Sequence, residues 1–244
     1  MLGKLIKYDF KAMSKSLCPV FAVMAVLSFV CSLMVKFRMT GGFIFTMFAI
    51  LLGVLISGSF AVTLYCVVRR FNSSLLKDEG YLSFALPVKT QDHIIAKLVN
   101  ALIWSTLEIV AVAVCVLIMG LIAGSIEDVR EVFTFFFKVD RSFWLSMIQV
   151  LVLMGLELTA SISLVYSSLS IGHMFEKHKR LIAWIFVIVM VILRTMFIPT
   201  HFQYDYASGN TLFISPVWYL IPLMYTVIYS LITWFILDKR LNLE

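Results

Sequence analysis

The chain has 244 residues, of which 61% are hydrophobic and only 14% are charged. A soluble domain of this length needs more polar side chains to cover its surface, so the composition excludes an ordinary soluble globular protein. It predicts an all-α integral membrane protein, because a helix satisfies its own backbone hydrogen bonds in lipid. The net charge of +6 suits anionic lipid and does not call for nucleic acid.

Six apolar stretches are each long enough to cross a hydrocarbon core of roughly 30 Å as a helix. They are continuous runs rich in Leu, Val, Ile, Met and Phe, without the alternation of barrel strands. The first run follows basic residues but has no clear cleavage site, so we expect it to be retained. The six expected spans are residues 17–35, 42–68, 98–124, 143–171, 181–198 and 217–237.

The distribution of Lys and Arg predicts the orientation, because positively charged segments resist translocation. Basic residues gather before the first span, between the second and third, between the fourth and fifth, and after the sixth. The segments on the opposite side have fewer, and residues 199–216 have none. We therefore expect one transmembrane domain, residues 1–244, that crosses the cell membrane several times with both termini in the cytoplasm.

Residues 1–16 have a helical pattern with two unlike faces. Asp9 is the exception, because it falls on the apolar side. One interpretation is an amphipathic helix that lies along the inner membrane interface, and the other is a basic flank that happens to be helical. The apolar face is Leu2, Leu5, Ile6, Phe10 and Met13, and the basic face is Lys4, Lys7, Lys11 and Lys15.

Residues 69–97 are too polar to span a membrane and too long for a simple turn. Asn72 or Ser73 is a candidate N-cap of a short helix that runs to Glu79, and Gly80 is a candidate for its end. Pro87 then closes a second short apolar piece. We expect a structured cytoplasmic loop.

The run EGYLSFALPV at residues 79–88, followed after a polar turn by IAKL at residues 95–98, resembles the loop after the second helix of short type-two ATP-binding-cassette (ABC) exporter permeases. The basic start, six spans and inner termini are similar too. The family includes bacterial peptide exporters such as the phenol-soluble-modulin exporter, and its loop carries a coupling helix that docks on a separate ATPase. The resemblance implies that the ATPase contact is Leu75, Leu76, Lys77, Asp78, Glu79, Gly80 and Tyr81; an ordinary loop of another polytopic protein is the alternative.

The resemblance also implies the cofactors and partners. The chain has no phosphate-binding Gly-x-x-x-x-Gly-Lys-Ser/Thr loop, so ATP and Mg²⁺ would bind the partner ATPase, with no cofactor on this chain. A second permease copy, identical or a sister chain, would complete a dimer that moves a hydrophobic or amphipathic substrate such as a toxin or antimicrobial peptide. We expect no catalytic residues and no metal site, because all four histidines lie outside the spans.

Three charged side chains lie inside the expected spans: Glu108, Glu157 and Arg194. A charge in hydrocarbon costs at least a few kcal/mol by insertion scales, which makes all three candidates for a translocation path. Glu108 lies about 15 Å from the inner end of its span, and Glu157 and Arg194 lie roughly 20 Å from theirs. The alternatives are a structural Glu157–Arg194 pair, an Arg194 that snorkels outward, and a Glu108 that is protonated or bonded to a neighbouring helix.

Two further sets of residues are candidates for contacts. Small residues in the second span, which recur every four positions, form a smooth face that packs within the subunit or at a dimer interface. The resemblance implies that residues 199–216 dip into the outer leaflet as a gate; an aromatic belt is the alternative. The packing face is Ala49, Gly53, Ser57 and Ala61, and the gate candidates are Phe202, Tyr204, Tyr206 and Phe213.

Two other functions stay open. A proton-coupled secondary transporter that uses Glu108 or Glu157 predicts transport that follows a pH gradient and needs no ATP. A non-transporting membrane scaffold or sensor predicts a partner protein but no flux.

Overall fold

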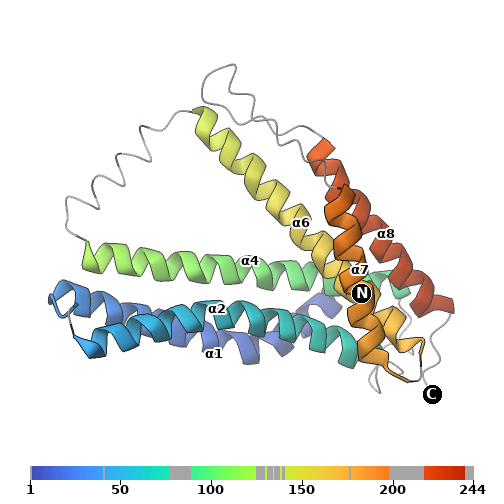
Figure 1. The fold of residues 1–244 in the computed structure, drawn as a ribbon, viewed down its shortest axis with the longest axis horizontal. Coiled ribbons are helices and arrows are strands. Elements are labelled where there is room, and N and C mark those ends of the chain that lie inside the picture. Colours follow the sequence, from blue (N-terminus) through green and yellow to red (C-terminus); the bar gives the residue numbers. More distant parts are fainter. Residues whose placement is uncertain are drawn as a thin grey trace. The chain divides into compact units, whose positions relative to one another are not determined.

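The computed structural model describes residues 2–40, 42–76, 89–124, 141–175, 177–197 and 217–239, with the single residues 130, 134 and 138. These residues are almost all helical and include no strand, which confirms the all-α prediction for this part of the chain. The elements are α1 (Leu2–Lys36), α2 (Phe43–Phe71), the π-helical turn η1 (Asn72–Leu76), α4 (Thr90–Ala123), α6 (Arg141–His173), α7 (Lys179–Phe197) and α8 (Val217–Lys239) (Figure 1).

Five of these helices are long and apolar enough to cross a membrane: α1, α2 with η1, α4, α6 and α8. The four longest have 33 to 35 residues and measure roughly 50 Å, well above the thickness of a hydrocarbon core. The 19 residues of α7 include Lys179, Arg180 and Arg194, and this helix is not among the five. The helices indicate a membrane-embedded protein, while the sixth span and the side of the termini stay predictions.

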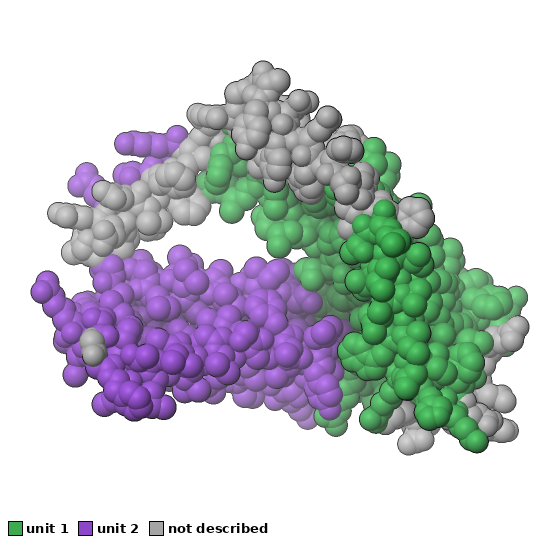
Figure 2. Space-filling view, viewed as in Figure 1, with its two compact units in different colours: residues 1–6, 68–102, 140–244 green, residues 7–67, 103–139 purple. Residues whose placement is uncertain are grey.

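The chain divides into two compact units, which are described one at a time (Figure 2). Unit 1 comprises residues 1–6, 68–102 and 140–244, and unit 2 comprises residues 7–67 and 103–139. Helices α1, α2 and α4 contribute residues to both.

Unit 2 contains most of α1 and α2 and the second half of α4. Its apolar core includes Leu27 and Cys31 of α1 and Leu52 of α2, against which Phe48, Ile56 and Met119 pack. Nearer the N-terminus, the ring of Trp104 on α4 stacks on Phe10 at 4.8 Å between centroids. The three helices therefore contact one another along much of their length.

The N-terminal residues do not form a separate helix. Residues 2–16 are the first turns of α1, which continues without a break to Lys36 even though Pro19 lies inside it. Asp9 and Met13 are buried, and Leu17 follows them on the same face, so packing of this face favours one continuous helix. The four lysines of the basic face are exposed.

The expected helix start at Asn72 or Ser73 is wrong. The residues from Asn72 to Leu76 continue α2 directly as η1, and the hydroxyl of Ser74 donates to the carbonyl of Arg70 at 2.6 Å. Phe71 and Leu75 are both fully buried, so tertiary packing keeps the chain helical where the local sequence resembles a cap. Residues 77–88, which include Gly80 and Pro87, lie outside the described residues.

Unit 1 is built around α6, which packs against both α7 and α8. The turn from α6 to α7 is tight: a Cβ on Gly172 would lie 2.5 Å from the carbonyl oxygen of Lys179 and 3.1 Å from Cβ of Ala183. Near the other end of α6, the hydroxyl of Tyr219 on α8 donates to the carbonyl of Gln149. These contacts hold α7 and α8 against α6.

Candidate functional site

The three charged residues that the sequence places inside spans each have polar neighbours among the described residues. Glu108 lies in unit 2, and Glu157 lies with Arg194 in unit 1. Their surroundings differ in exposure, hydrogen bonding and charge balance.

In unit 2, Glu108 on α4 is fully buried and bonded to two hydroxyl groups of α2. Ser59 and Thr63 are four residues apart, so they lie one turn apart on the same face of α2 and reach the same carboxyl group. The hydroxyl of Thr63 donates to Oε2 at 2.7 Å, and that of Ser59 makes a short hydrogen bond with Oε1. Both hydroxyl residues are themselves buried.

Ser59 also has an acceptor on its own helix. Its hydroxyl oxygen lies 2.7 Å from the carbonyl oxygen of Ile56, and because a hydroxyl has one proton, it donates either to this carbonyl or to Glu108.

The face of α4 is also buried on either side of Glu108. Trp104, one turn earlier on that face, is 1% exposed, and Cys115, two turns later, is 2% exposed. Glu108 therefore connects α2 and α4 through buried hydrogen bonds within this unit. Ser59 and Thr63 were not among the predicted site residues, although two hydroxyl residues four positions apart in the same expected span are a recognisable signal.

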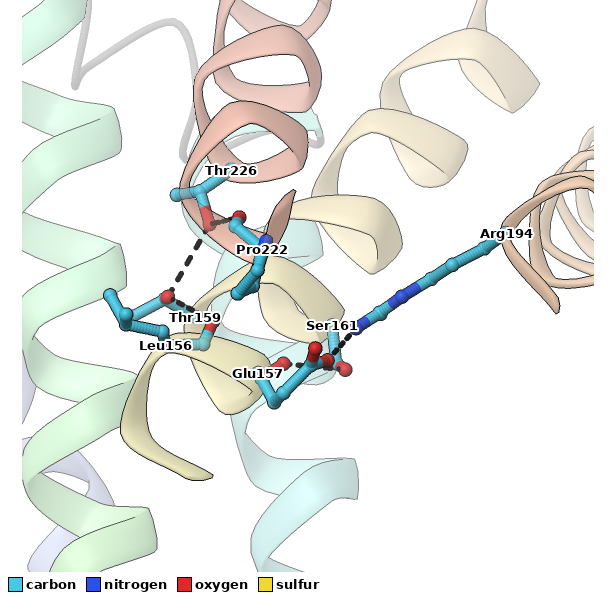
Figure 3. A network of polar contacts seen from close by, with 7 residues as sticks. All are labelled: Leu156, Glu157, Thr159, Ser161, Arg194, Pro222 and Thr226. Carbon is cyan, nitrogen blue, oxygen red and sulfur yellow. Dashed lines mark hydrogen bonds and ion pairs between the residues drawn. The ribbon is translucent and has the colours of Figure 1, made fainter. Parts of the chain in front are cut away.

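In unit 1, Arg194 on α7 forms an ion pair with Glu157 on α6 (Figure 3). The guanidinium carbon also lies 5.6 Å from the ring centroid of Tyr225 on α8, within the range of a cation–π contact. Both members of the pair are partly exposed in the single chain. Side chains of three helices therefore meet at one charged site.

Hydroxyl groups join α6 to α8 near this pair. The hydroxyl oxygens of Thr159 and Thr226 lie 3.4 Å apart, and each hydroxyl also has a carbonyl of its own helix as an alternative acceptor. Figure 3 shows Arg194 reaching from α7 to Glu157, while Thr159 faces Thr226. Glu157 and Thr159 are two residues apart, so they project from nearly opposite sides of α6.

The two clusters offer different chemistry. Glu157 and Arg194 present one anion and one cation with partial access, so they can exchange their mutual bonds for bonds to a polar or zwitterionic group. Glu108 is fully buried, and both of its carboxyl oxygens already have hydrogen-bond partners. The better candidate for substrate contact is therefore the Glu157–Arg194 pair.

The predicted packing face of α2 is exposed along its whole length. Ala49, Gly53, Ser57 and Ala61 are all exposed, and a Cβ on Gly53 would meet nothing within 4 Å. The hydroxyl of Ser57 donates to the carbonyl of Gly53 on its own helix. Among the described residues of unit 2, no helix covers this face.

The other predicted residues lie partly outside the described residues. Leu75 and Leu76, expected to contact an ATPase, are buried in η1, so here their side chains contact their own chain. Lys77, Asp78, Glu79, Gly80 and Tyr81 lie outside the described residues, as do the gate candidates Phe202, Tyr204, Tyr206 and Phe213. Among the residues that are described, no three His, Cys, Asp or Glu side chains gather into a metal-binding group.

Comparison with known proteins finds no similar family model, no similar curated protein and no similar solved structure.

Proposed function

We propose that this chain is the transmembrane subunit of an ATP-driven ABC exporter. In this proposal a separate ATPase subunit hydrolyses ATP, two permease copies form the path, and the substrate is hydrophobic or amphipathic, such as a toxin or antimicrobial peptide. The main support is the resemblance of residues 79–98 to the coupling loop of short permeases. Five long apolar helices are consistent with it.

The observation that carries the proposal is the way the described structure holds both flanks of residues 77–88. Before this segment, Ser74, Leu75 and Leu76 are buried in η1; after it, Ile94 and Ala96 are buried in the first turns of α4. A segment whose two flanks are packed into helices passes a force on to those helices. A freely hinged loop would absorb the force instead.

The Glu157–Arg194 pair is a second observation that supports the proposal. An amphipathic substrate has polar groups that lose their water inside the membrane, and a partly exposed ion pair compensates that loss. In the proposed cycle, ATP binding brings the two ATPases together, and the coupling segments move the helices that surround the path.

The test is purification of the tagged chain from its native host in mild detergent, with mass spectrometry of the proteins that accompany it. We expect an ABC ATPase with the native sequence, and its loss when Asp78 and Glu79 are both changed to Lys. The matched control changes Glu127 and Asp128, an equivalent acidic pair in the expected outer segment, to Lys. The control variant should retain the ATPase.

A chain that purifies alone under conditions that preserve other membrane complexes would contradict the proposal. It would favour the proton-coupled carrier or the scaffold instead. Transport in proteoliposomes with a pH gradient and no ATP would then separate these two.

A further inference from the structure

One side chain of α6 contacts both flanks of residues 77–88. The ring of Tyr166 stacks on that of Phe71, the last residue of α2, with 4.1 Å between centroids and 9° between planes. Its hydroxyl donates to the backbone carbonyl of Lys97, two turns into α4, at 3.3 Å. All three residues are buried, and all belong to unit 1.

The two contacts are of different kinds and act on different helices. The stack of the Tyr166 and Phe71 rings is apolar and shields both rings from water. The hydrogen bond from the Tyr166 hydroxyl to the carbonyl of Lys97 fixes the position of α4 along the axis of α6. Leu75, one turn after Phe71, is fully buried and extends the packing into η1. Tyr166 therefore ties the end of α2 and the start of α4 to one point of α6.

We propose that Tyr166 is the positioning residue that couples the end of α2 and the start of α4 to the Glu157–Arg194 pair. Glu157 lies on the same helix, nine residues earlier, which corresponds to about 13.5 Å along the axis. A displacement of the α2 and α4 ends acts on α6 at Tyr166, between Glu157 and the turn at Gly172 that leads to α7, and so shifts Glu157 relative to Arg194 on α7. The partly exposed ion pair is the element that changes partners.

This inference rests on the proposed function only in taking residues 77–88 as the docking segment. The coupling itself is reciprocal, so a change at the ion pair must also change the stability of the η1 packing. It is therefore measurable in the full-length chain without an ATPase.

The experiment measures the rate at which a maleimide labels a cysteine in η1. Ser74→Cys is nearly isosteric, and Ser74 is only 5% exposed, so its labelling reports opening of the turn. The four native cysteines, Cys18, Cys31, Cys66 and Cys115, are changed to Ala, and the full chain is held in lipid nanodiscs. A denatured sample gives the rate for an open site.

Tyr166→Phe removes only the hydroxyl bond, and we expect roughly two- to tenfold faster labelling. Tyr166→Leu also removes the stack and should label faster still. The matched control is Tyr219→Phe, which removes the same kind of bond, from a tyrosine hydroxyl to a helix carbonyl, at Gln149 on α6. The control should label at the native rate.

The coupling is read from Arg194→Gln. With Tyr166 present, we expect this change at the ion pair to alter the labelling rate at residue 74 by roughly two- to tenfold. In the Tyr166→Leu background the same change should have no further effect. Equal effects in the two backgrounds, no effect in either, or an unchanged rate in both Tyr166 variants would each overturn the inference.

The two proposals fail in different experiments. A chain that shows Tyr166-dependent coupling but binds no ATPase keeps this inference and loses the proposed function. A chain that binds an ATPase but shows no such coupling keeps the proposed function and loses this inference.

Discussion

The hydroxyl of Thr63 on α2 donates a 2.7 Å hydrogen bond to the buried carboxyl group of Glu108 on α4. Ser59, one turn away, bonds the other oxygen, so both oxygens of the acid have partners from the same neighbouring helix. This relationship explains how an acidic side chain is accommodated at a fully buried position where the described residues provide no basic partner.

We predict that Glu108→Gln is tolerated, whereas Glu108→Asp is not. An amide of the same length donates to Ser59 and accepts from Thr63, so the free energy of unfolding should change by less than about 0.5 kcal/mol. The shorter aspartate loses both bonds and stays buried, which should cost about 1–3 kcal/mol. Reversible unfolding in mixed micelles measures both. An equal loss in the two variants would show that the charge of Glu108 matters rather than its hydrogen bonds.

Changes at the ion pair should be strongly non-additive. Glu157→Gln leaves Arg194 with the ring of Tyr225 but without its anion, and Arg194→Gln leaves Glu157 without its cation. Because the pair is partly exposed, we expect a coupling energy of about 1–2 kcal/mol, between the values for surface and buried pairs. A double-mutant cycle on unfolding free energy measures it. Additive effects within about 0.3 kcal/mol would mean that the pair contributes nothing to stability.

Gly172→Ala should disrupt the turn between α6 and α7. The added Cβ would lie 2.5 Å from a backbone oxygen that cannot rotate away, so the backbone must move, at a cost of about 1–3 kcal/mol. Gly155→Ala is the matched control on the same helix, where nothing lies within 4 Å of the new Cβ. This control should be neutral or stabilising, since Ala is the better helix former. Thermal unfolding of the two variants in one detergent tests the difference, and similar behaviour would contradict the close approach.

The sequence predicted the helical class well because hydropathy over about 20 residues is a strong signal. It also placed Glu157 and Arg194 at similar depth on adjacent helices, which is the condition for the pair seen here. It did not predict that Asn72 continues α2, because a cap signal is local and the burial of Phe71 and Leu75 is tertiary. It did not predict the contacts of Tyr166 either, since nothing in its own span shows that its neighbours come from α2 and α4.

The exposed small-residue face of α2 gives the last prediction. Gly53→Leu adds a side chain whose Cβ would meet no other described part of the chain within 4 Å beyond its own helix backbone and sequence neighbours, so the stability of a single chain should change by less than about 0.5 kcal/mol. If a second permease copy covers this face, as the proposed function requires of some surface, the bulk prevents close approach and the dimer fraction falls. Gly58→Leu, on the same helix and about 140° away at 100° per residue, is the matched control and should leave the dimer intact. Single-molecule photobleaching in nanodiscs counts the copies. A dimer that survives Gly53→Leu would show that this face contacts lipid and that the subunit interface lies elsewhere.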